Sequence, residues 1–424
     1  MGNLDYTQVL NKIENTRRFG NEPGVVVTAQ VIKVLREKGK QKRIIPYIHV
    51  AGTNGKGSVC AFFSSILKKE HMRVGTFVSP HLVDFEERIT VDGRMIPKED
   101  VTRLGNYLLD IDFGIGLTMF DYCLAMALLY FEEQQCDYMV IETGLGGRLD
   151  STNAIGTPQC AVITKIGYDH MAILGSDIAD IAAEKAGIIK ENGTVVVEQQ
   201  DKRAMQVIKQ EAKKKHARII TVEQSDIARC SGYALRLCGT FQWENAAAAE
   251  LAARYVLGKR YSGPEYETQN DKTGLPGKEA GLKDRIKSAL EEAVWPGRME
   301  IVSDEPFLLV DGAHNSNGVD ALKESLMQMY PGEKFCFFMG VMADKDYDVM
   351  IREILPLAEE FYTVTPDSDR ALQASHLADF IRKEGVCATE LSGVDEIRKH
   401  LKRDTKNVAF GSLYFIGELK QHHI

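Results

Sequence analysis

The sequence predicts an α/β fold with two domains, each built on a mainly parallel sheet. From about residue 44 onward, short β-branched runs alternate with helical patterns, which is typical of βαβ units. The chain has 424 residues, enough for two or three domains at roughly 150 residues each. Hydrophobic residues make up 44% and charged residues 26%, so we expect a folded globular protein with full cores.

The larger domain is expected at residues 1–294, as a parallel-sheet domain with a phosphate-binding loop. Its strands are predicted in short apolar runs, most of which are separated by segments of helical periodicity. These runs are residues 47–50, 74–78, 138–142, 161–166, 194–198 and 218–222.

The smaller domain is expected at residues 295–424, as a Rossmann-like α/β domain. Before it, residues 257–283 are polar, rich in glycine and almost without aliphatic side chains, which predicts an exposed loop near a domain boundary. After Trp295-Pro296-Gly297 the alternation resumes. Strands are predicted at 307–311, 335–339, 361–364 and 408–411, with helices at 318–329 and 346–355 among the segments between them.

Charge and cysteine content exclude several classes of protein. Lys+Arg 52 against Asp+Glu 60 gives a net charge of −8, which provides no basic field for nucleic acid or anionic membranes. The eight cysteines form no C-x-x-C pair and several lie in apolar runs, so we expect reduced core thiols without zinc or disulfides. The start has no secretory pattern, and the most apolar stretch, 119–131, is too short to span a bilayer. A cytoplasmic protein is expected.

A glycine-rich loop joins the strand at 47–50 to a helical pattern. In Gly52-Thr53-Asn54-Gly55-Lys56-Gly57-Ser58, glycines let backbone N–H groups face an anion, the helix N-terminus adds positive potential, and Lys56 neutralises terminal phosphates. Ser58 can bind Mg²⁺. The strict G-x-x-x-x-G-K-[ST] pattern fails, because Val50 replaces the first glycine and Gly57 separates Lys56 from Ser58. Nucleotide binding is predicted; the alternative is a glycine-rich turn with a surface lysine.

This loop and several other segments resemble the folylpolyglutamate synthase branch of the Mur-ligase superfamily, which is often bifunctional with dihydrofolate synthase. The resemblance covers nearly the whole chain, and several blocks in the family's order are far more specific than the loop alone. The blocks are Phe19-Gly20, Pro23-Gly24, residues 49–58, Ser79-Pro80-His81-Leu82, Glu87-Arg88-Ile89, residues 142–153, Asp169-His170, residues 184–187, Gln242, residues 245–247, Pro296-Gly297-Arg298, residues 311–315 and residues 411–414.

The resemblance implies an ATP-dependent ligase that joins L-glutamate to a folate carboxylate. ATP would phosphorylate the carboxylate to an acyl phosphate, and the amine would then displace phosphate. It leaves open whether reduced folates, dihydropteroate or both are substrates. The implied partners are ATP, L-glutamate and the folate or dihydropteroate. We expect a monomer that binds neither nucleic acid nor membranes.

Metal ligands are expected at the ends of strands. Glu142 follows an apolar strand, so its carboxylate should reach the carboxyl edge of the sheet and bind Mg²⁺ there; a surface salt bridge is the alternative. The resemblance adds Ser79 to this metal, assigns His170 to a second one and implies that Lys185 is carbamylated to help hold it. Without the resemblance, Ser79 would be a turn residue and His170 structural. Lys185 would be an exposed lysine paired with Glu184 or another neighbour on its helix.

The resemblance also implies which residues bind the substrates. Asn54, Gly55, Lys56, Gly57 and Ser58 would bind ATP, with Lys56, His170 and Lys185 as catalytic groups. Asn245 would lie near adenine, with Arg298, Asp311 and His314 reaching from the smaller domain. Read by itself, Asn245 could equally cap a helix and Arg298 could be a solvated linker charge. For the pterin or folate pocket the candidates are Pro80, His81, Phe120, Arg148 and Asp150; Phe120 could stack on the ring or belong to the core. Asp121 departs from the family pattern, where we expect Glu.

Two rival functions remain to be distinguished. Ligases that act on UDP-muramyl peptides generally carry a UDP-binding domain of about 100 residues before the loop, and Gly52 leaves too little chain for it. A nucleotide-gated interaction protein would use the loop as a switch, but it does not predict a second domain with Arg298, Asp311 and His314. ADP release that depends on both a folate-type acid and glutamate would separate ligase from switch.

Overall fold

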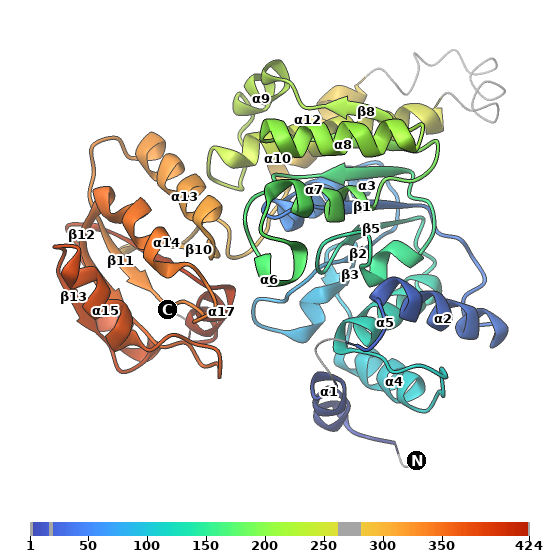
Figure 1. Cartoon of the computed structure of the whole chain (residues 1–424), viewed down its shortest axis with the longest axis horizontal. Helices are drawn as coiled ribbons and strands as arrows, with labels where there is room; N and C mark the ends of the chain where they lie inside the picture. Colours follow the sequence, from blue (N-terminus) through green and yellow to red (C-terminus); the bar gives the residue numbers. More distant parts are fainter. Residues whose placement is uncertain (1–2, 17–19, 262–280, 423–424) are drawn as a thin grey trace. The chain divides into compact units, whose positions relative to one another are not determined.

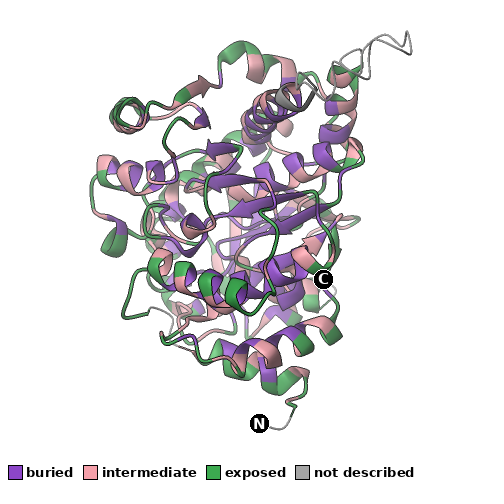
Figure 2. Cartoon of the chain, turned by 90° about the vertical axis from the view of Figure 1, so that its right-hand side faces the viewer, coloured by how far each residue is buried: buried purple, intermediate pink, exposed green. Residues whose placement is uncertain are grey.

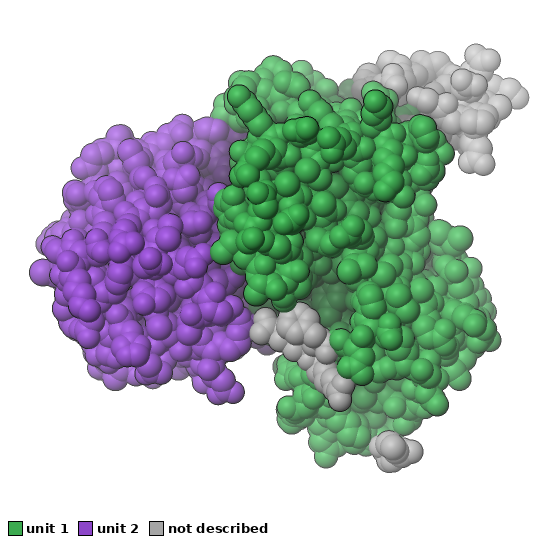
Figure 3. Space-filling model, in the orientation of Figure 1, with its two compact units in different colours: residues 1–81, 85–234, 244–293 green, residues 82–84, 235–243, 294–424 purple. Residues whose placement is uncertain are grey.

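The computed structural model describes residues 3–16, 20–261 and 281–422 (Figure 1). The chain divides into two compact units, which Figure 3 shows in different colours. The first unit consists of residues 1–81, 85–234 and 244–293, and the second of residues 82–84, 235–243 and 294–424. Each unit is built around its own sheet, which confirms the α/β class.

The first unit contains an eight-stranded sheet with the order β4-β3-β2-β5-β1-β6-β7-β8. Its strands are parallel except for the β3–β4 hairpin, which runs antiparallel beside β2. The strands are β1 (Tyr47–Ala51), β2 (Val74–Phe77), β3 (Ile89–Val91), β4 (Arg94–Met95), β5 (Tyr138–Glu142), β6 (Cys160–Ile163), β7 (Thr194–Val197) and β8 (Arg218–Thr221).

Helices connect and cover these strands, as Figure 1 shows. One core cluster combines buried residues of α1, α2, α4 and α5 with residues of β2 and β5, and another combines residues of β6 and β7 with residues of α7 and α8. The helical segments are α1 (Tyr6–Glu14), α2 (Gly24–Glu37), α3 (Lys56–Lys69), η1 (Phe85–Arg88), α4 (Lys98–Leu109), α5 (Met119–Glu133), η2 (Ser151–Ala154), α6 (Met171–Leu174), α7 (Ile178–Ala186), α8 (Lys202–Lys214), α9 (Gln224–Ser231), α10 (Phe241–Tyr261) and α12 (Leu282–Glu292).

Strand β1 lies between β5 and β6, and all of its residues are buried. Its register places Val50 beside Glu142 of β5 and Val162 of β6. Figure 2 shows the central strands almost entirely in the colour of buried residues, as expected for parallel strands covered on both faces. Because these strands run in one direction, the segments after Ala51, Phe77 and Glu142 leave the sheet at the same edge.

The second unit contains a six-stranded sheet with the order β13-β12-β11-β14-β10-β9, in which only the edge strand β9 is antiparallel. Its strands are β9 (Glu300–Asp304), β10 (Phe307–Asp311), β11 (Phe335–Met339), β12 (Ala358–Thr363), β13 (Ala388–Glu390) and β14 (Lys406–Phe410). Its helical segments are α13 (Ser316–Met329), α14 (Tyr347–Ile354), η3 (Leu355–Leu357), α15 (Ala374–Lys383), η4 (Val394–Glu396), α16 (Ile397–His400) and α17 (Leu413–Gln421).

Several predicted boundaries need correction. The strand predicted at 161–166 ends at Ile163, because Thr164 turns away and donates its amide to Ala51 O at 2.8 Å. The polar loop predicted at 257–283 is too wide, because α10 continues to Tyr261 and α12 begins at Leu282. Residues 262–280, and Phe19 of the family pattern, lie outside the described residues.

Four strands were not predicted: β3, β4, β9 and β13. The β3–β4 hairpin turns at Asp92-Gly93, and both residues have positive φ, 53° and 78°. An Asp-Gly pair between strands is a strong hairpin signal, so this turn was within reach of the sequence.

Six of the eight cysteines are buried, Cys238 is half-buried and Cys387 is exposed, and all eight are free thiols. Among the described residues, no helix is both long enough and apolar enough to cross a membrane.

Candidate active site

The predicted phosphate loop lies between β1 and α3, at the carboxyl edge of the first sheet. Gly55 precedes α3 with φ +89°, a conformation that glycine adopts without strain. A Cβ atom at Gly55 would overlap the side-chain oxygen of Asn245, so Asn245 lies directly against the loop. Asn245 is the fifth residue of α10, which contradicts the alternative that it caps this helix.

Lys56, Ser79 and Glu142 meet at this edge. Lys56 Nζ lies 3.7 Å from Glu142 Oε1, and the Ser79 amide donates to Glu142 Oε2 at 3.3 Å. Glu142 is only 4% exposed, so it is not a surface salt bridge. The Lys56 side chain is 17% exposed and also donates to Thr53 O at 3.3 Å. The alternative of a surface lysine is therefore wrong.

The segment after β6, residues 164–167, forms hydrogen bonds with the phosphate loop. The amides of Thr53 and Asn54 both donate to Lys165 O, and the Thr164 hydroxyl donates to Asn54 O at 2.6 Å. The Thr53 hydroxyl exchanges two hydrogen bonds of 3.0 Å with the backbone of Gly167. These hydrogen bonds fix the backbone of Thr53 and Asn54 against the segment at 164–167.

Lys185 extends from α7 to the same loop, and its ammonium donates to Gly52 O at 2.8 Å. The residue is 4% exposed, which contradicts the alternative of an exposed lysine paired with Glu184. Burial, together with the nearby charge of Lys56, lowers the pKa of Lys185 to about 7, although Asp169 opposes the shift. A substantial share of the amine is therefore neutral near neutral pH, and only the neutral amine reacts with CO₂.

His170 follows β6 at the N-cap of α6 and has φ +52°. It is exposed, and its Nε2 lies 3.9 Å from Asp169 Oδ1. The negative charge of Asp169 favours the protonated form of Lys185 and so opposes the fall in the pKa of Lys185. Lys56, Ser79 and Glu142 thus form one group of contacts, and Lys185 reaches the same loop at Gly52 O.

Three of the candidates for the pterin pocket, Pro80, His81 and Phe120, differ in exposure and in the residues they contact. Ser79-Pro80 is a cis peptide after β2, and Pro80 is exposed. His81 Nδ1 accepts from Arg88 Nε at 2.9 Å. Phe120 is half-buried, packs edge-on against Phe77 with 5.5 Å between ring centroids, and lies close to Gly144. Phe120 therefore contacts the core and also borders the loop that follows β5.

Arg148 and Asp150 belong to that loop but are engaged within the protein. Arg148 forms an ion pair with Glu184 of α7. The Asp150 carboxylate is buried and accepts from the amides of Gly144 and Leu145 at 3.0 and 2.9 Å, and also from Thr152. Burial raises the pKa of Asp150, and these hydrogen bonds oppose the rise. Its observed contacts shape the loop.

The departure at Asp121 also has a structural explanation. Asp121 is the third residue of α5 and accepts from the Thr118 amide and hydroxyl, forming a capping box. Its other oxygen accepts from the Ser151 hydroxyl at 2.6 Å. A short carboxylate therefore satisfies the helix start and ties α5 to η2.

In the second unit, Arg298, Asp311 and His314 gather at the end of β10. The Asp311 carboxylate accepts the amides of Met299 and Ala313 at 2.8 Å each, and burial raises its pKa while the charge of Arg298 opposes the rise. The guanidinium of Arg298 lies against Gly312, and His314 Nδ1 is 2.7 Å from Gly312 O. Arg298 is half-buried and packed, so it is not a solvated linker charge.

Two buried oxygen-bearing side chains at this edge of the sheet suit a magnesium ion. The Glu142 carboxylate and the Ser58 hydroxyl are both buried at the phosphate loop, and hard oxygen ligands are what Mg²⁺ prefers. No cluster of three or more His, Cys, Asp or Glu side chains suited to a metal occurs within residues 3–16, 20–261 and 281–422. A magnesium ion at Glu142 and Ser58 would therefore also need phosphate oxygens and water, as is usual for this ion.

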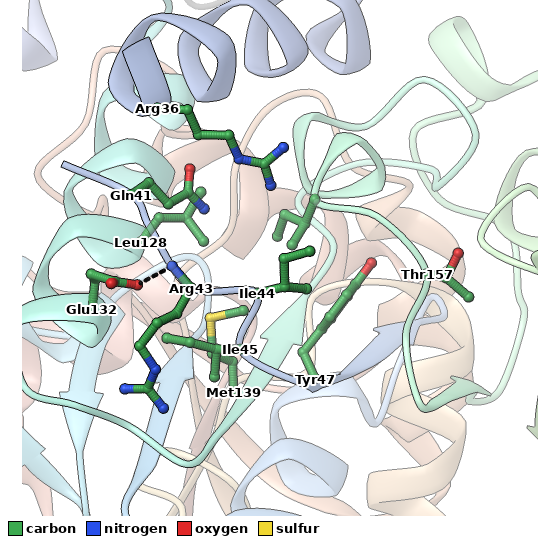
Figure 4. A pocket seen from close by; sticks show the side chains of 11 residues that line it. Arg36, Gln41, Arg43, Ile44, Ile45, Tyr47, Leu128, Glu132, Met139 and Thr157 are labelled. Carbon is green, nitrogen blue, oxygen red and sulfur yellow. Dashed lines mark hydrogen bonds between the residues drawn. The ribbon is translucent and has the colours of Figure 1, made fainter. Parts of the chain in front are cut away.

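A small cavity lies at the opposite end of β1, lined by Arg36, Arg43 and Tyr47 among others (Figure 4). Tyr47 is the first residue of β1, so the cavity is at the amino edge of the sheet. Its volume of about 30 Å³ has room for about one water molecule. The cavity is too small for a nucleotide or a folate.

Sequence reasoning assigned no role to His49 or Thr152, although both lie inside segments that carry the family pattern. The structure joins them through a buried contact of 2.8 Å between His49 Nε2 and Thr152 Oγ1. His49 precedes the phosphate loop by three residues and Thr152 follows Asp150 by two. Their positions in those segments were the available signal.

Comparison with known proteins places this site in a family. Residues 50–232 match the Mur ligase middle domain, and residues 297–411 match the Mur ligase glutamate ligase domain. A dihydrofolate synthase/folylpolyglutamate synthase of Bacillus subtilis is 33% identical, with 98% of each chain covered. A folylpolyglutamate synthase of Lacticaseibacillus casei is 30% identical, with 87% of each chain covered.

Solved structures agree with these relatives. A Mycobacterium tuberculosis folylpolyglutamate synthase complexed with ADP and AMPPCP has a TM-score of 0.82 at 25% identity, covering 99% of this chain and 98% of that one. E. coli FolC in complex with DHPP and ADP has a TM-score of 0.80 at 26% identity, covering 99% and 97%. The chain belongs to the dihydrofolate synthase/folylpolyglutamate synthase family of Mur ligases.

Proposed function

We propose that the chain is an ATP-dependent ligase that joins L-glutamate to the carboxylate of a folate, of dihydropteroate, or of both. The observation that carries this proposal is the contact of Lys56 with the buried Glu142, 3.7 Å apart, at the start of α3. An ammonium and a carboxylate at a helix N-terminus can together hold a triphosphate and its metal. The family relatives support the choice of substrates.

In the proposed reaction a carboxylate oxygen of the acid attacks the terminal phosphorus of ATP, and ADP leaves. Lys56 and the amides of Asn54, Gly55, Gly57 and Ser58 neutralise the charge that builds up on the phosphate. The amino group of L-glutamate then attacks the acyl carbon, loses a proton, and inorganic phosphate departs. The protein mainly positions the reactants and offsets charge.

Glu142, Ser58 and Ser79 are proposed to hold the first magnesium ion, which would supply charge neutralisation at the phosphates. His170 and a carbamylated Lys185 are proposed for a second ion. Burial of the Lys185 amine and its lowered pKa support this, because carbamylation needs a neutral amine. Carbamylation would replace the buried ammonium by an anionic group with two oxygens.

We further propose that residues 1–294 form the ATP-binding domain and residues 295–424 the glutamate-ligase domain. Asn245 lies against the phosphate loop, which supports a place near the base of the nucleotide. Arg298, Asp311 and His314 share the end of β10, which supports a joint contact with ATP. Pro80, His81, Phe120, Arg148 and Asp150 are proposed to form or shape the folate pocket, in a monomer that works in the cytoplasm.

Product analysis by mass tests this function. The protein would be incubated with ATP, Mg²⁺ and L-glutamate, in parallel with dihydropteroate, with tetrahydrofolate, or with neither acid. A product heavier by one glutamate residue, with ADP release that requires both the acid and glutamate, is expected. ADP release that is independent of both would instead support the nucleotide switch.

A further inference from the structure

A buried chain of hydrogen bonds links β1 to the loop after β5, and the proposed reaction makes no use of it. His49, in β1, is fully buried, and its Nε2 lies 2.8 Å from Thr152 Oγ1. The Thr152 hydroxyl contacts Asp150 Oδ1, and the Thr152 amide donates to the same oxygen at 3.0 Å. Asp150 Oδ2 accepts the amides of Gly144 and Leu145. The chain therefore runs from the phosphate-loop strand to the backbone of the loop after Glu142.

The directions of these bonds follow from the number of donors. Three backbone N–H groups point at the Asp150 carboxylate, so this group acts as an acceptor. The single hydrogen of the Thr152 hydroxyl therefore points to Asp150, and the hydroxyl oxygen accepts from His49 Nε2–H. His49 Nδ1 is then the unprotonated nitrogen, and it has no hydrogen-bond partner among the described residues.

His49 is expected to be uncharged near neutral pH. Burial, with a contribution from the nearby charge of Lys190, lowers the pKa of His49 to about 3. The ring is neutral, and its one useful group is a fixed N–H donor. Thr152 is also fully buried, so water cannot replace either group without opening the core.

We propose that His49 and Thr152 are positioning residues that, through Asp150, set the backbone of residues 144–148 in the shape that receives the folate substrate. The inference rests on the proposed function for the identity of that substrate. In this proposal Asp150 shapes the loop and does not bind the substrate directly, because its carboxylate already accepts the amides of Gly144, Leu145 and Thr152. Phe120, which lies against Gly144, would be held in place by the same loop.

Substitutions at Thr152 test the proposal. Thr152→Val keeps the shape and removes the hydroxyl, whereas Thr152→Ser keeps the hydroxyl. We expect Thr152→Val to raise KM for the folate substrate about tenfold, the effect of losing one hydrogen bond, with kcat and KM for ATP unchanged. Thr152→Ser should restore the wild-type KM. Unchanged KM for the folate substrate in Thr152→Val contradicts the proposal.

Substitutions at His49 separate a donor from a catalytic imidazole. His49→Gln places a neutral N–H near the position of Nε2, whereas His49→Met fills similar space without a donor. His49→Gln should retain a KM for folate close to wild type, and His49→Met should resemble Thr152→Val. If the Gln and Met variants are equally impaired, a fixed donor is not what the site needs, and the proposal fails.

Hydrogen exchange in the ligand-free protein gives a readout that is independent of catalysis. Thr152→Val should speed exchange of the Gly144 and Leu145 amides about tenfold. Thr194→Val is the matched control, because it removes a buried threonine hydroxyl that contacts Tyr255 at 2.7 Å elsewhere in the same sheet. If both variants speed exchange of the Gly144 and Leu145 amides equally, the effect is general destabilisation of the protein, and the proposal is wrong.

The two sets of measurements keep this inference distinct from the proposed function. If the wild-type protein released no ADP with folate and glutamate, the proposed function would fail, while the exchange data would still show whether Thr152 holds the loop. If the wild type is an active ligase and Thr152→Val exchanges and reacts like wild type, only the positioning role is wrong.

Discussion

Glu142 and Asp311 are each the buried last residue of an inner strand, β5 in the first sheet and β10 in the second, but their partners differ. Glu142 faces the ammonium of Lys56 and one backbone amide. Asp311 accepts two backbone amides, which hold its carboxylate in one orientation. A lysine can give way to a metal ion or a phosphate without any change in the backbone. We infer that Glu142 exchanges partners during turnover, whereas Asp311 presents a fixed acceptor.

The largest effect is expected at Lys56. Lys56→Ala should lower the rate of ADP formation about a thousandfold, because the charge on the transferred phosphate loses its nearest cation. Lys69→Ala is the control: Lys69 is on the same helix and pairs with Glu292 at 2.6 Å. The control should retain activity and fold. Normal turnover by a folded Lys56→Ala variant would contradict the proposed phosphate site. It would also contradict the inferred exchange of partners at Glu142.

Glu142→Gln should have the next largest effect, with activity reduced about a hundredfold at millimolar Mg²⁺. The neutral amide binds Mg²⁺ more weakly, so a titration with Mg²⁺ should recover part of the rate. Glu292→Gln provides the matched change of an exposed carboxylate. An unaltered Mg²⁺ dependence in Glu142→Gln would show that Glu142 is not a metal ligand.

Asp311→Asn should lower stability more than Glu142→Gln does, and it should lower activity less. The amide has a single acceptor oxygen, so the amide of Met299 or Ala313 loses its partner, which costs about 1–3 kcal/mol of unfolding free energy. KM for ATP should rise by about tenfold and the Mg²⁺ dependence should stay unchanged. Denaturant unfolding and ATP titrations measure both. A shift in Mg²⁺ dependence equal to that of Glu142→Gln would erase the distinction between the two carboxylates.

The last expected effect is on the pH dependence of stability and comes from Lys185. Its pKa is about 7 in the folded protein and about 10.4 in an unfolded chain, so between these values the unfolded state binds more protons. Stability should therefore rise with pH in this window, by about 1.4 kcal/mol per unit from this residue. We expect the difference in unfolding free energy between wild type and Lys185→Met to follow this slope in CO₂-free buffer. A constant difference from pH 7 to 10 would contradict the lowered pKa.

Strand and loop identity were largely predictable, because the relevant signals are local. The strands at 138–142, 307–311 and 335–339 were predicted with correct bounds, since buried parallel strands are unbroken apolar runs. The missed strands β3, β4, β9 and β13 are short or lie at sheet edges, where a half-exposed strand has no such run.

Several site residues could not be interpreted locally. Asn245 had the pattern of a helix cap, yet it is inside α10 and against Gly55, almost two hundred residues away in the chain. Lys185 had the pattern of an exposed helical lysine, yet it is buried with its ammonium on Gly52 O. Burial and charge proximity depend on which helix covers which loop, and a single sequence does not state that pairing.

Local chemistry along the chain was enough to determine the α/β class, the strand-loop-helix around Lys56 and the family pattern, because glycine, apolar runs and strand-end carboxylates act over a few residues. The tertiary structure alone decided the partner of each buried polar group: Lys56 for Glu142, Gly52 O for Lys185, and His49 for Thr152. Hydrogen bonds and desolvation act between atoms that are near in space, and those atoms come together only when distant segments pack.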